Sequence, residues 1–298
     1  MIITLDVPDD FSFWRTVYSH GWCSLPPFEV DKNNNHLKRI LELSSGKKIL
    51  AEISQSSKRS INVSTITKLS AKERIDIAAQ LSSCFRLNED YSSFYSEMKK
   101  YKEFQWVSKS GAGRLLRSPT VFEDVVKMIC TTNCSWALTE IMVGNLCKKL
   151  GCKVDDLKYT FPKPEAIAGK SEKYLRKEIR AGYRSSYLLE LSRRIVKGEL
   201  EIESWRKTIL PTEELFDVVR SVKGVGPYAA GNILKLLGRY DYLGIDSWCR
   251  KQFFEIHKNG RKTSDKVIEK HYEPFGEWKG LFFWMDVTKH WYEKEFPF

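Results

Sequence analysis

The chain has 298 residues, 42% of them hydrophobic, which is enough for a substantial core in one or two domains. Its net charge of +11 favours a polyanionic partner, although charge bears on association and not on fold. No run approaches the roughly 18 apolar residues of a membrane-spanning helix, and Met1 to Pro8 lack the basic flank and cleavage signal of a secretory peptide. We therefore expect a soluble, intracellular protein with no membrane contact.

Seven cysteines are scattered along the chain, and no CxxC pair occurs among them. Most have apolar neighbours, where a reduced cysteine behaves as a small hydrophobic residue. Cys130 and Cys134, like Cys147 and Cys152, have a loosely metal-like spacing, but no paired histidines accompany them. The pattern favours a reducing compartment and no zinc site.

The first part of the chain has the pattern of a small antiparallel sheet. Short segments alternate apolar with polar residues and are separated by turns rich in Asn, Ser and Gly. The predicted strands are Met1–Val7, Leu37–Leu43, Lys48–Ile53 and Ser60–Ile66.

From Ser70 onward the apolar period becomes helical, and Ser70 with Glu73 forms a capping box. Thr120 opens a second helix with an apolar stripe. The further predicted helices are Ser135–Leu150, Glu172–Arg180, Ser185–Lys197, Glu213–Val222, Pro227–Leu237, Ser247–His257 and Trp278–Tyr292. This layout predicts a mainly α fold with a small antiparallel β-sheet domain (α+β). We divide it into residues 1–110, the sheet domain and its following helices, and residues 111–298, a helical domain whose last helices could pack back on the first.

The most informative segment joins two of these helices. The predicted helix 213–222 runs into Lys223-Gly224-Val225-Gly226, and Pro227 opens the next helix. Two glycines one residue apart permit a tight turn with exposed backbone amides. Those amides and the positive end of the second helix predict a phosphate site. The alternative is a helix-turn-helix connection without a binding function, in which the glycines only relieve steric crowding in the turn.

Asp246 lies 20 residues beyond Gly226, directly before a new helix. One interpretation of Asp246 is a helix N-cap. The other is a catalytic carboxylate held at a cleft by the helix start. The two are compatible, because a capping position fixes the side chain.

These features resemble the helix-hairpin-helix superfamily of DNA glycosylases, HhH-GPD, in its 3-methyladenine and 8-oxoguanine glycosylase branch. The resemblance rests on Val222–Gly226, on Gly244–Asp246 and on the interval between them. Upstream, Ile129–Cys134 resembles the junction that supplies the residue filling the gap left by a flipped nucleotide. Phe161–Pro164 and Gly182–Arg184 match two further landmarks of that branch. The resemblance implies a DNA repair enzyme of base excision, with double-stranded DNA containing a damaged base as its partner.

By this resemblance, Asp246 stabilises the sugar cation that forms as the base departs and helps to position water. A nearby anion suits that chemistry, since the glycosidic transition state is oxocarbenium-like. The resemblance implies that Asn133 fills the gap left by the flipped nucleotide, that Tyr183 acts as a wedge, and that Arg184 bonds to the estranged base. The amides of Gly224, Gly226 and Tyr228 would hold a phosphate, with Lys223 as a further DNA contact. The carbonyls of Arg220, Val222 and Val225 would hold a monovalent cation that bridges to a phosphate.

Members of the family that also nick the strand carry a lysine two residues after the second hairpin glycine. This chain has Tyr228 there, and tyrosine forms no Schiff base. The sequence therefore predicts hydrolysis by water without lyase activity. Some relatives bind an iron–sulfur cluster through four cysteines after the catalytic domain, but only Cys249 lies beyond Cys152. We expect no such cluster and no other cofactor.

The base pocket is expected to be aromatic. At the position of a glutamine with which 8-oxoguanine enzymes contact the flipped base, this chain has Phe283. An apolar aromatic pocket suits an electron-poor alkylated purine. Candidates, each of which could instead be a core residue, are Tyr228, Trp136, Trp248, Phe283 and Trp284.

Two groups of basic residues are candidates for phosphate contact. Six lie between Lys170 and Arg184, where a solvated helical face is the alternative, and Arg114 and Arg117 form the second group. The other functional interpretations are a glycosylase for oxidised or mismatched bases and a non-catalytic protein that uses the hairpin only to bind DNA. Nothing in the sequence argues against a monomer acting wherever the genome is.

Overall fold

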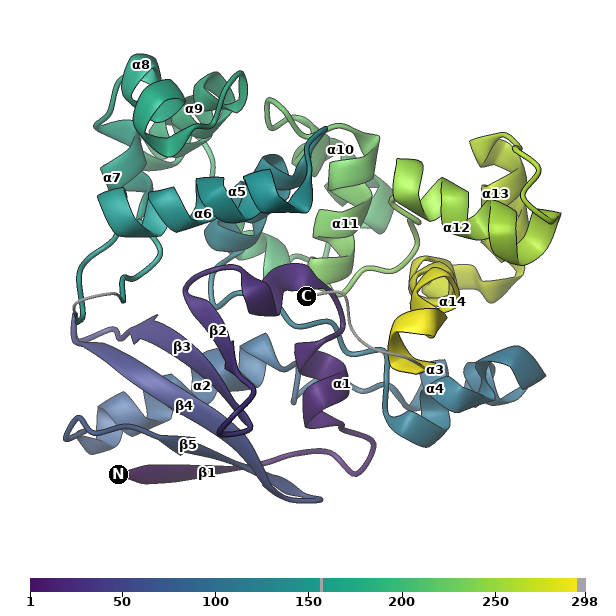
Figure 1. Cartoon of the computed structure of the whole chain (residues 1–298), viewed down its shortest axis with the longest axis horizontal. Coiled ribbons are helices and arrows are strands. Elements are labelled where there is room, and N and C mark those ends of the chain that lie inside the picture. Colours follow the sequence, from purple (N-terminus) through teal and green to yellow (C-terminus); the bar gives the residue numbers. More distant parts are fainter. Residues whose placement is uncertain (156–157, 294–298) are drawn as a thin grey trace. The chain divides into compact units, whose positions relative to one another are not determined.

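The computed structural model (Figure 1) describes residues 1–155 and 158–293. These residues form two compact units. The first comprises Met1–Glu89 and Arg114–Glu203, and the second comprises Asp90–Gly113 and the described residues from Ser204 onward. Neither unit is continuous in sequence, whereas we had divided the chain at residue 110. That division stays a prediction about domains. Among the described helices, none is long and apolar enough to cross a membrane.

The first unit contains one antiparallel sheet with the strand order β1-β5-β4-β3-β2. Four strands were predicted, and β2 was missed because it has only four residues and directly follows Pro26 and Pro27. Its pairing with β3, in which Phe28 faces Arg39, supplies the order that its own short pattern lacks. The strands are β1 Ile2–Asp6, β2 Phe28–Asp31, β3 His36–Glu42, β4 Lys48–Ser57 and β5 Ser60–Ser64.

Three helices of the first unit, α2, α5 and α6, begin directly after the residues Ser70, Thr120 and Ser135 with which the sequence opens them, whereas α1 and α7 were not predicted. The Ser70 and Glu73 capping box is present at α2, and the Thr120 hydroxyl accepts the Glu123 amide at the start of α5. The predicted helix 172–180 is instead a short α8 followed by a π-helical turn, Leu175–Ile179, which ends at Arg180 with a positive φ of 65°. The helices are α1 Phe13–Val17, α2 Ala71–Cys84, α5 Val121–Thr131, α6 Trp136–Leu150, α7 Pro164–Ala168, α8 Glu172–Tyr174 and α9 Arg184–Val196.

The described part of the second unit is helical and is packed largely through aromatic side chains. Phe275 and Phe282 stack with their ring centroids 4.0 Å apart, and Phe94 meets Phe282 edge-on. The helices are α3 Ser92–Lys99, α4 Gln105–Ser110, α10 Thr212–Arg220, α11 Pro227–Leu237, α12 Ser247–Lys258, α13 Asp265–Tyr272 and α14 Lys279–Glu293. The mainly α fold with a small antiparallel sheet is confirmed.

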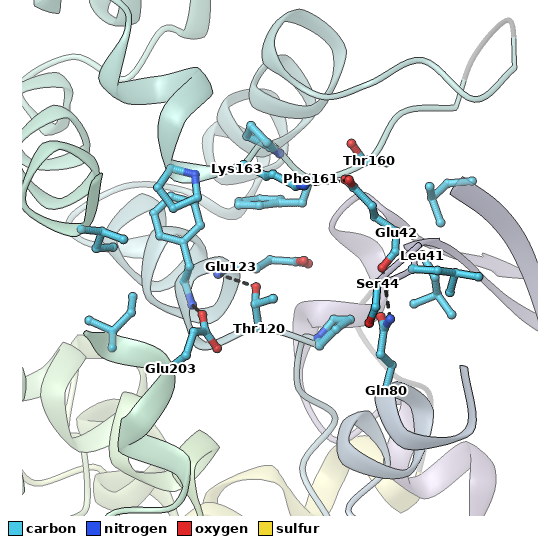
Figure 2. Close-up of a pocket in the computed structure, with 18 of the residues that line it drawn as sticks. Leu41, Glu42, Ser44, Gln80, Thr120, Glu123, Thr160, Phe161, Lys163 and Glu203 are labelled. Carbon is cyan, nitrogen blue, oxygen red and sulfur yellow. Dashed lines mark hydrogen bonds and ion pairs between the residues drawn. The ribbon is translucent and has the colours of Figure 1, made fainter. Parts of the chain in front are cut away.

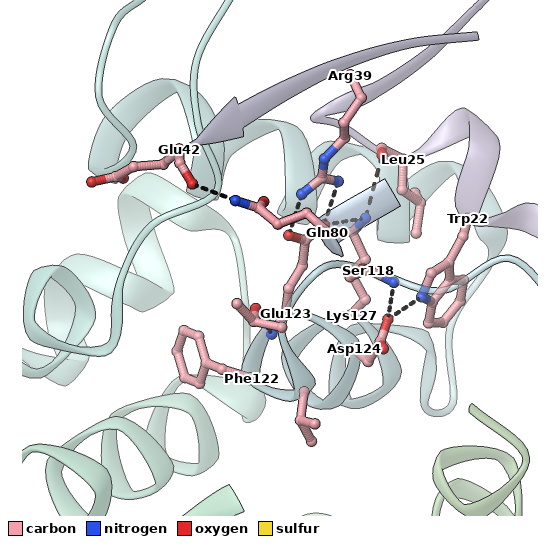
Figure 3. A network of polar contacts seen from close by, with 12 residues as sticks. Trp22, Leu25, Arg39, Glu42, Gln80, Ser118, Phe122, Glu123, Asp124 and Lys127 are labelled. Carbon is pink, nitrogen blue, oxygen red and sulfur yellow. Dashed lines mark hydrogen bonds and ion pairs between the residues drawn. The ribbon is translucent and has the colours of Figure 1, made fainter. Parts of the chain in front are cut away.

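A buried ionic cluster joins the sheet to α5 inside the first unit (Figure 3). Arg39 of β3 donates two hydrogen bonds to the Glu123 carboxylate at 2.8 and 2.6 Å, and Lys127 lies 2.7 Å from it. Burial alone would raise the pKa of Glu123, but the charges of Arg39 and Lys127 outweigh it and lower the pKa to about 2. Glu123 therefore stays ionised and compensates two buried cations.

Replacing Glu123 by Gln should destabilise the protein by about 3–5 kcal/mol, because two cations lose their buried counter-charge. The stability that Glu123 contributes is present above the ordinary carboxyl pKa of about 4.3 and should be lost as the pH falls toward about 2. Urea unfolding at several pH values measures both effects. The control is Glu172→Gln, which removes an exposed pair with Arg176 and should change the unfolding free energy by less than about 0.5 kcal/mol. Equal effects of the two substitutions would contradict the assigned role.

Candidate active site

The glycine hairpin connects α10 to α11 in the second unit. Gly224 has a φ of +88°, a conformation that favours glycine, whereas Gly226 is the N-cap of α11 in extended backbone. The Val225 amide donates to the Val222 carbonyl at 3.0 Å and closes the turn. Val222 and Val225 are buried while Lys223 is exposed. The turn is thus anchored by its valines, and the first amides of α11, which have no partner within the helix, lie at its start.

Asp246 is the N-cap of α12, as the sequence predicts. Its Oδ1 accepts a hydrogen bond of 2.7 Å from the Cys249 amide, and its backbone φ of −118° is extended. The side chain is half-buried. Arg250 on the same helix is held by Asp265 of α13 through two bonds of 2.6 and 2.7 Å. The carboxylate of Asp246 is therefore fixed in orientation by the start of the helix.

The segment that leads to Asp246 is tightly packed against α11. A Cβ on Gly231 would lie 2.9 Å from the Cα and N of Gly244, and Gly244 itself has a φ of +69°. The Asn232 amide group donates to the Gly244 carbonyl at 3.4 Å, and the Lys235 ammonium donates to the Leu243 carbonyl at 2.6 Å. Backbone contact and two side-chain bonds thus set the path of the chain into α12.

Aromatic rings gather next to Asp246 in the same unit. Trp248, two residues on, lies with its ring centroid 6.4 Å from that of Trp284 and 5.2 Å from that of Trp291. Trp248 and Trp284 are half-buried, as is Tyr228 in the first turn of α11, whereas Phe283 is fully buried. Four of the five predicted pocket residues therefore belong to the second unit.

The predicted DNA-contact residues of the first unit come together at the turn between α5 and α6. Asn133 lies exposed in that turn with a φ of +47°. The Tyr183 hydroxyl and the Arg184 guanidinium both donate to the carbonyl of Thr132, and the guanidinium lies 4.5 Å from the Tyr183 ring centroid. Arg184 is only 3% exposed, so contact with a base would require it to leave this carbonyl.

Three sequence candidates have internal roles in the first unit. The Trp136 indole donates to Ser24 and Glu140, and its ring occupies the space where a Cβ of Gly21 would lie. The interpretation of Arg114 and Arg117 as phosphate contacts is wrong, because both are buried and paired. Arg114 bonds to Asp10 at 2.7 Å, and Arg117 lies 3.0 Å from Glu89.

One group in the second unit brings together side chains of metal-ligand type. The potential ligand atoms of His257, His271 and Asp286 lie within 4.8 Å of one another. The His257 Nε2 lies 2.6 Å from the Asp286 carboxylate, which also accepts a bond from the Tyr272 hydroxyl. These hydrogen bonds give the three helices α12, α13 and α14 a shared polar contact.

A cavity of about 610 Å³ lies in the first unit beside β3 and the start of α5 (Figure 2). The Glu203 carboxylate accepts the amides of Val121 and Phe122 at 2.8 and 2.9 Å, so it caps α5 from a distant part of the sequence. Among the described residues, the lining includes none of those predicted for catalysis or DNA contact. Sequence reasoning missed Glu203, because nothing in its local pattern indicates a distant cap.

Comparison with known protein families shows the family to which the chain belongs. Residues 126–277, slightly more than half of the chain, match the model of the HhH-GPD superfamily of base excision DNA repair proteins. The chain belongs to this superfamily. The matched residues include the hairpin, Asp246 and the turn at Asn133.

Among individual curated proteins, one relative is a probable N-glycosylase/DNA lyase from Methanothermobacter thermautotrophicus. It is 27% identical over 218 residues, which are 65% of this chain and 68% of the relative. The chain spans less than half the length of two other curated relatives that it matches.

Solved structures share the fold over almost the whole chain. A 3-methyladenine DNA glycosylase from Archaeoglobus fulgidus superposes with a TM-score of 0.76 at 20% identity, over 97% of this chain and 99% of that one. An 8-oxoguanine glycosylase/lyase from Clostridium acetobutylicum superposes with a TM-score of 0.75 at 21% identity, over 96% and 95% of the two chains. At such identities the likeness concerns the fold.

The contact of Gly231 with Gly244 can be tested by adding one methyl group. Gly231→Ala should lower the unfolding free energy by about 1–3 kcal/mol, because its Cβ meets backbone that cannot rotate away. The control is Gly144→Ala in α6, where a Cβ meets no atom within 4 Å. That substitution should stabilise the protein by about 0.5–1 kcal/mol through helix propensity. Thermal or urea unfolding measures both, and stabilisation by both would contradict the close approach.

Proposed function

We propose that this chain is a DNA glycosylase that hydrolyses the bond between a damaged base and deoxyribose, with Asp246 as its catalytic residue. The observation that carries the proposal is the half-buried Asp246 carboxylate, held by the first turn of α12. Departure of the base leaves positive charge on the sugar, and a preorganised anion lowers the energy of that transition state. The same carboxylate can orient the attacking water.

The remaining predicted residues are proposed DNA contacts, described for each unit by itself. The start of α11, with Gly224, Gly226 and Lys223, would hold a phosphate, and the carbonyls of Arg220, Val222 and Val225 would bind a monovalent cation beside it. Although the Val222 carbonyl already accepts one hydrogen bond, a carbonyl oxygen has a second lone pair for an ion. In the first unit, Asn133, Tyr183 and Arg184 would support duplex DNA from which the target nucleotide has been flipped out. Such a reaction requires access to genomic DNA.

Asp246→Asn tests the catalytic role with little change in structure, since asparagine also caps helices well. The variant should release base about 10²–10³ times more slowly or worse, because it loses the anion but keeps the fold. Single-turnover release from lesion-containing duplex measures the rate, and fluorescence anisotropy with abasic duplex should show retained binding. The control is Glu255→Gln, an exposed carboxylate on the same helix. Full activity of the aspartate variant would rule out the mechanism.

The aromatic cluster supports alkylated purines as the substrate class. The half-buried rings of Trp248 and Trp284 are proposed to stack with an electron-poor base, and they lie on α12 and α14, which follow Asp246. Tyr228 and the buried Phe283 belong to the same unit, and Trp136 is kept as a further proposed pocket residue. The name of the Archaeoglobus relative agrees with this class, whereas that of the Clostridium relative favours oxidised bases as the alternative.

The enzyme is proposed to stop at the abasic site. Tyr228 occupies the register of the lyase lysine, and a phenol cannot form the imine that strand cleavage needs. The name of the Methanothermobacter relative includes lyase activity, so this property needs a direct test.

Purified protein should be incubated with duplexes that contain alkylated, oxidised, deaminated or mismatched bases. We expect fastest release from alkylated purines, strands that break only after hot alkali, and no covalent adduct after borohydride treatment. Fastest release from another lesion would change the substrate class, and an adduct would contradict the monofunctional assignment. Salt-sensitive DNA binding without release from any duplex would instead favour a non-catalytic hairpin protein.

A further inference from the structure

Lys235 is a charged side chain in the apolar face of α11. It lies between Leu234 and Leu236 and is only 2% exposed. A buried ammonium is costly unless its protons are bonded and its charge is compensated. Neither the hairpin motif nor the proposed base chemistry accounts for a lysine at this position.

The contacts of Lys235 point to the segment that precedes Asp246. Its Nζ donates to the Leu243 carbonyl at 2.6 Å, three residues before the proposed catalytic carboxylate. Asn232, one turn earlier on α11, donates to the next carbonyl, that of Gly244, at 3.4 Å. Two side chains of one helix therefore hold two successive carbonyls of the segment, and only one of the two side chains carries charge.

The groups that surround the Lys235 ammonium come from α12 and α14. The titratable groups that act on it are Asp246 and the thiol of Cys249, both at the start of α12. From α14 it meets the rings of Phe283 and Trp284, whose centroids lie 5.9 and 5.4 Å from Nζ. Burial raises the pKa of the Cys249 thiol well above its usual value, so the thiol is neutral. Arg250, one turn after Asp246 on α12, is engaged by Asp265, and the neighbouring Lys251 is exposed.

We propose that Lys235 is a positioning residue for base excision: its buried ammonium fixes the Leu243 carbonyl and thereby holds the segment that sets the position of the Asp246 carboxylate. The proposal rests on the proposed function, because it acts through Asp246. It assigns Lys235 no covalent step, and its Nζ is occupied by the carbonyl bond.

A dependence on pH follows. Burial lowers the pKa of Lys235 to about 8, although the negative charge of Asp246 opposes the shift. The free lysine pKa is about 10.4, so between these values the unfolded chain binds more protons than the folded one. The Lys235 contribution therefore makes the protein more stable as the pH rises from about 8 to 10.4. The rate of base release should fall around pH 8, where the ammonium of the folded protein loses its proton and its bond to the Leu243 carbonyl weakens.

The test uses the full-length chain with Lys235→Met, Lys235→Arg, Asn232→Ala and the exposed control Lys251→Met. Single-turnover base release and urea unfolding are measured between about pH 6.5 and 9.5, around the shifted pKa. Lys235→Met should release base about tenfold more slowly or worse at pH 7 and should lose the decline near pH 8. Its stability at pH 7 should be unchanged or higher, and its binding to abasic duplex should be retained.

The other variants separate charge from packing. Lys235→Arg should restore part of the rate at pH 7 and remove the decline, since arginine keeps its proton throughout this range. Asn232→Ala should slow release but keep the decline, because the two bonds that it removes, to the Tyr228 and Gly244 carbonyls, are both neutral. Lys251→Met should behave as the unmodified protein.

Several results would overturn the proposal. Release by Lys235→Met at the rate and pH profile of the unmodified protein would do so, and so would a borohydride adduct on Lys235, which would make it a nucleophile. If Lys235→Met fails to fold, the unmodified protein still provides a test: a rate of base release that does not change across pH 8 would contradict the proposal. Failure of the proposed function looks different: the unmodified protein would release no base, or Asp246→Asn would be fully active.

Discussion

The close approach of α11 to the segment before Asp246 is the constraint on which the proposed active site depends. Gly231 and Gly244 leave no room for a methyl group between two backbones, and a Cβ on Gly280 of α14 would lie even closer to backbone, against the Tyr242 carbonyl oxygen. The segment therefore has one path into α12. Because α12 begins where that path ends, the orientation of the Asp246 carboxylate follows from backbone packing rather than from its own hydrogen bond alone.

Buried charge recurs in both units, with different consequences. In the first unit, Glu123 compensates Arg39 and Lys127 in one compact cluster that ties β3 to α5. In the second unit, Lys235 has a carbonyl and a half-buried carboxylate to balance it, and its pKa is lowered. The first arrangement serves the fold. The second imposes a cost that we explain by the bond with which Lys235 holds the segment before Asp246.

Local patterns predicted most of the helices and four of the five strands, because caps and apolar periods are encoded within a few residues. α11 begins at Pro227 and ends at Leu237 as predicted, and Asp246 caps α12. Prediction failed where pairing partners decide the structure. β2 is ordered by β3, and the helix predicted from 172 to 180 becomes a π-helical turn that ends in a left-handed residue.

The sequence by itself determined the family, the hairpin and the candidate carboxylate, since each is carried by residue types at short fixed spacings. It also predicted Tyr228 in place of a lyase lysine. Only the tertiary structure decided that Arg114 and Arg117 are internal ion-pair residues, that Glu203 caps α5, and that Lys235 holds the segment before Asp246. The reason is physical: a charged side chain has the same letter whether water or protein surrounds it, and its burial and partners come from segments far away in the chain.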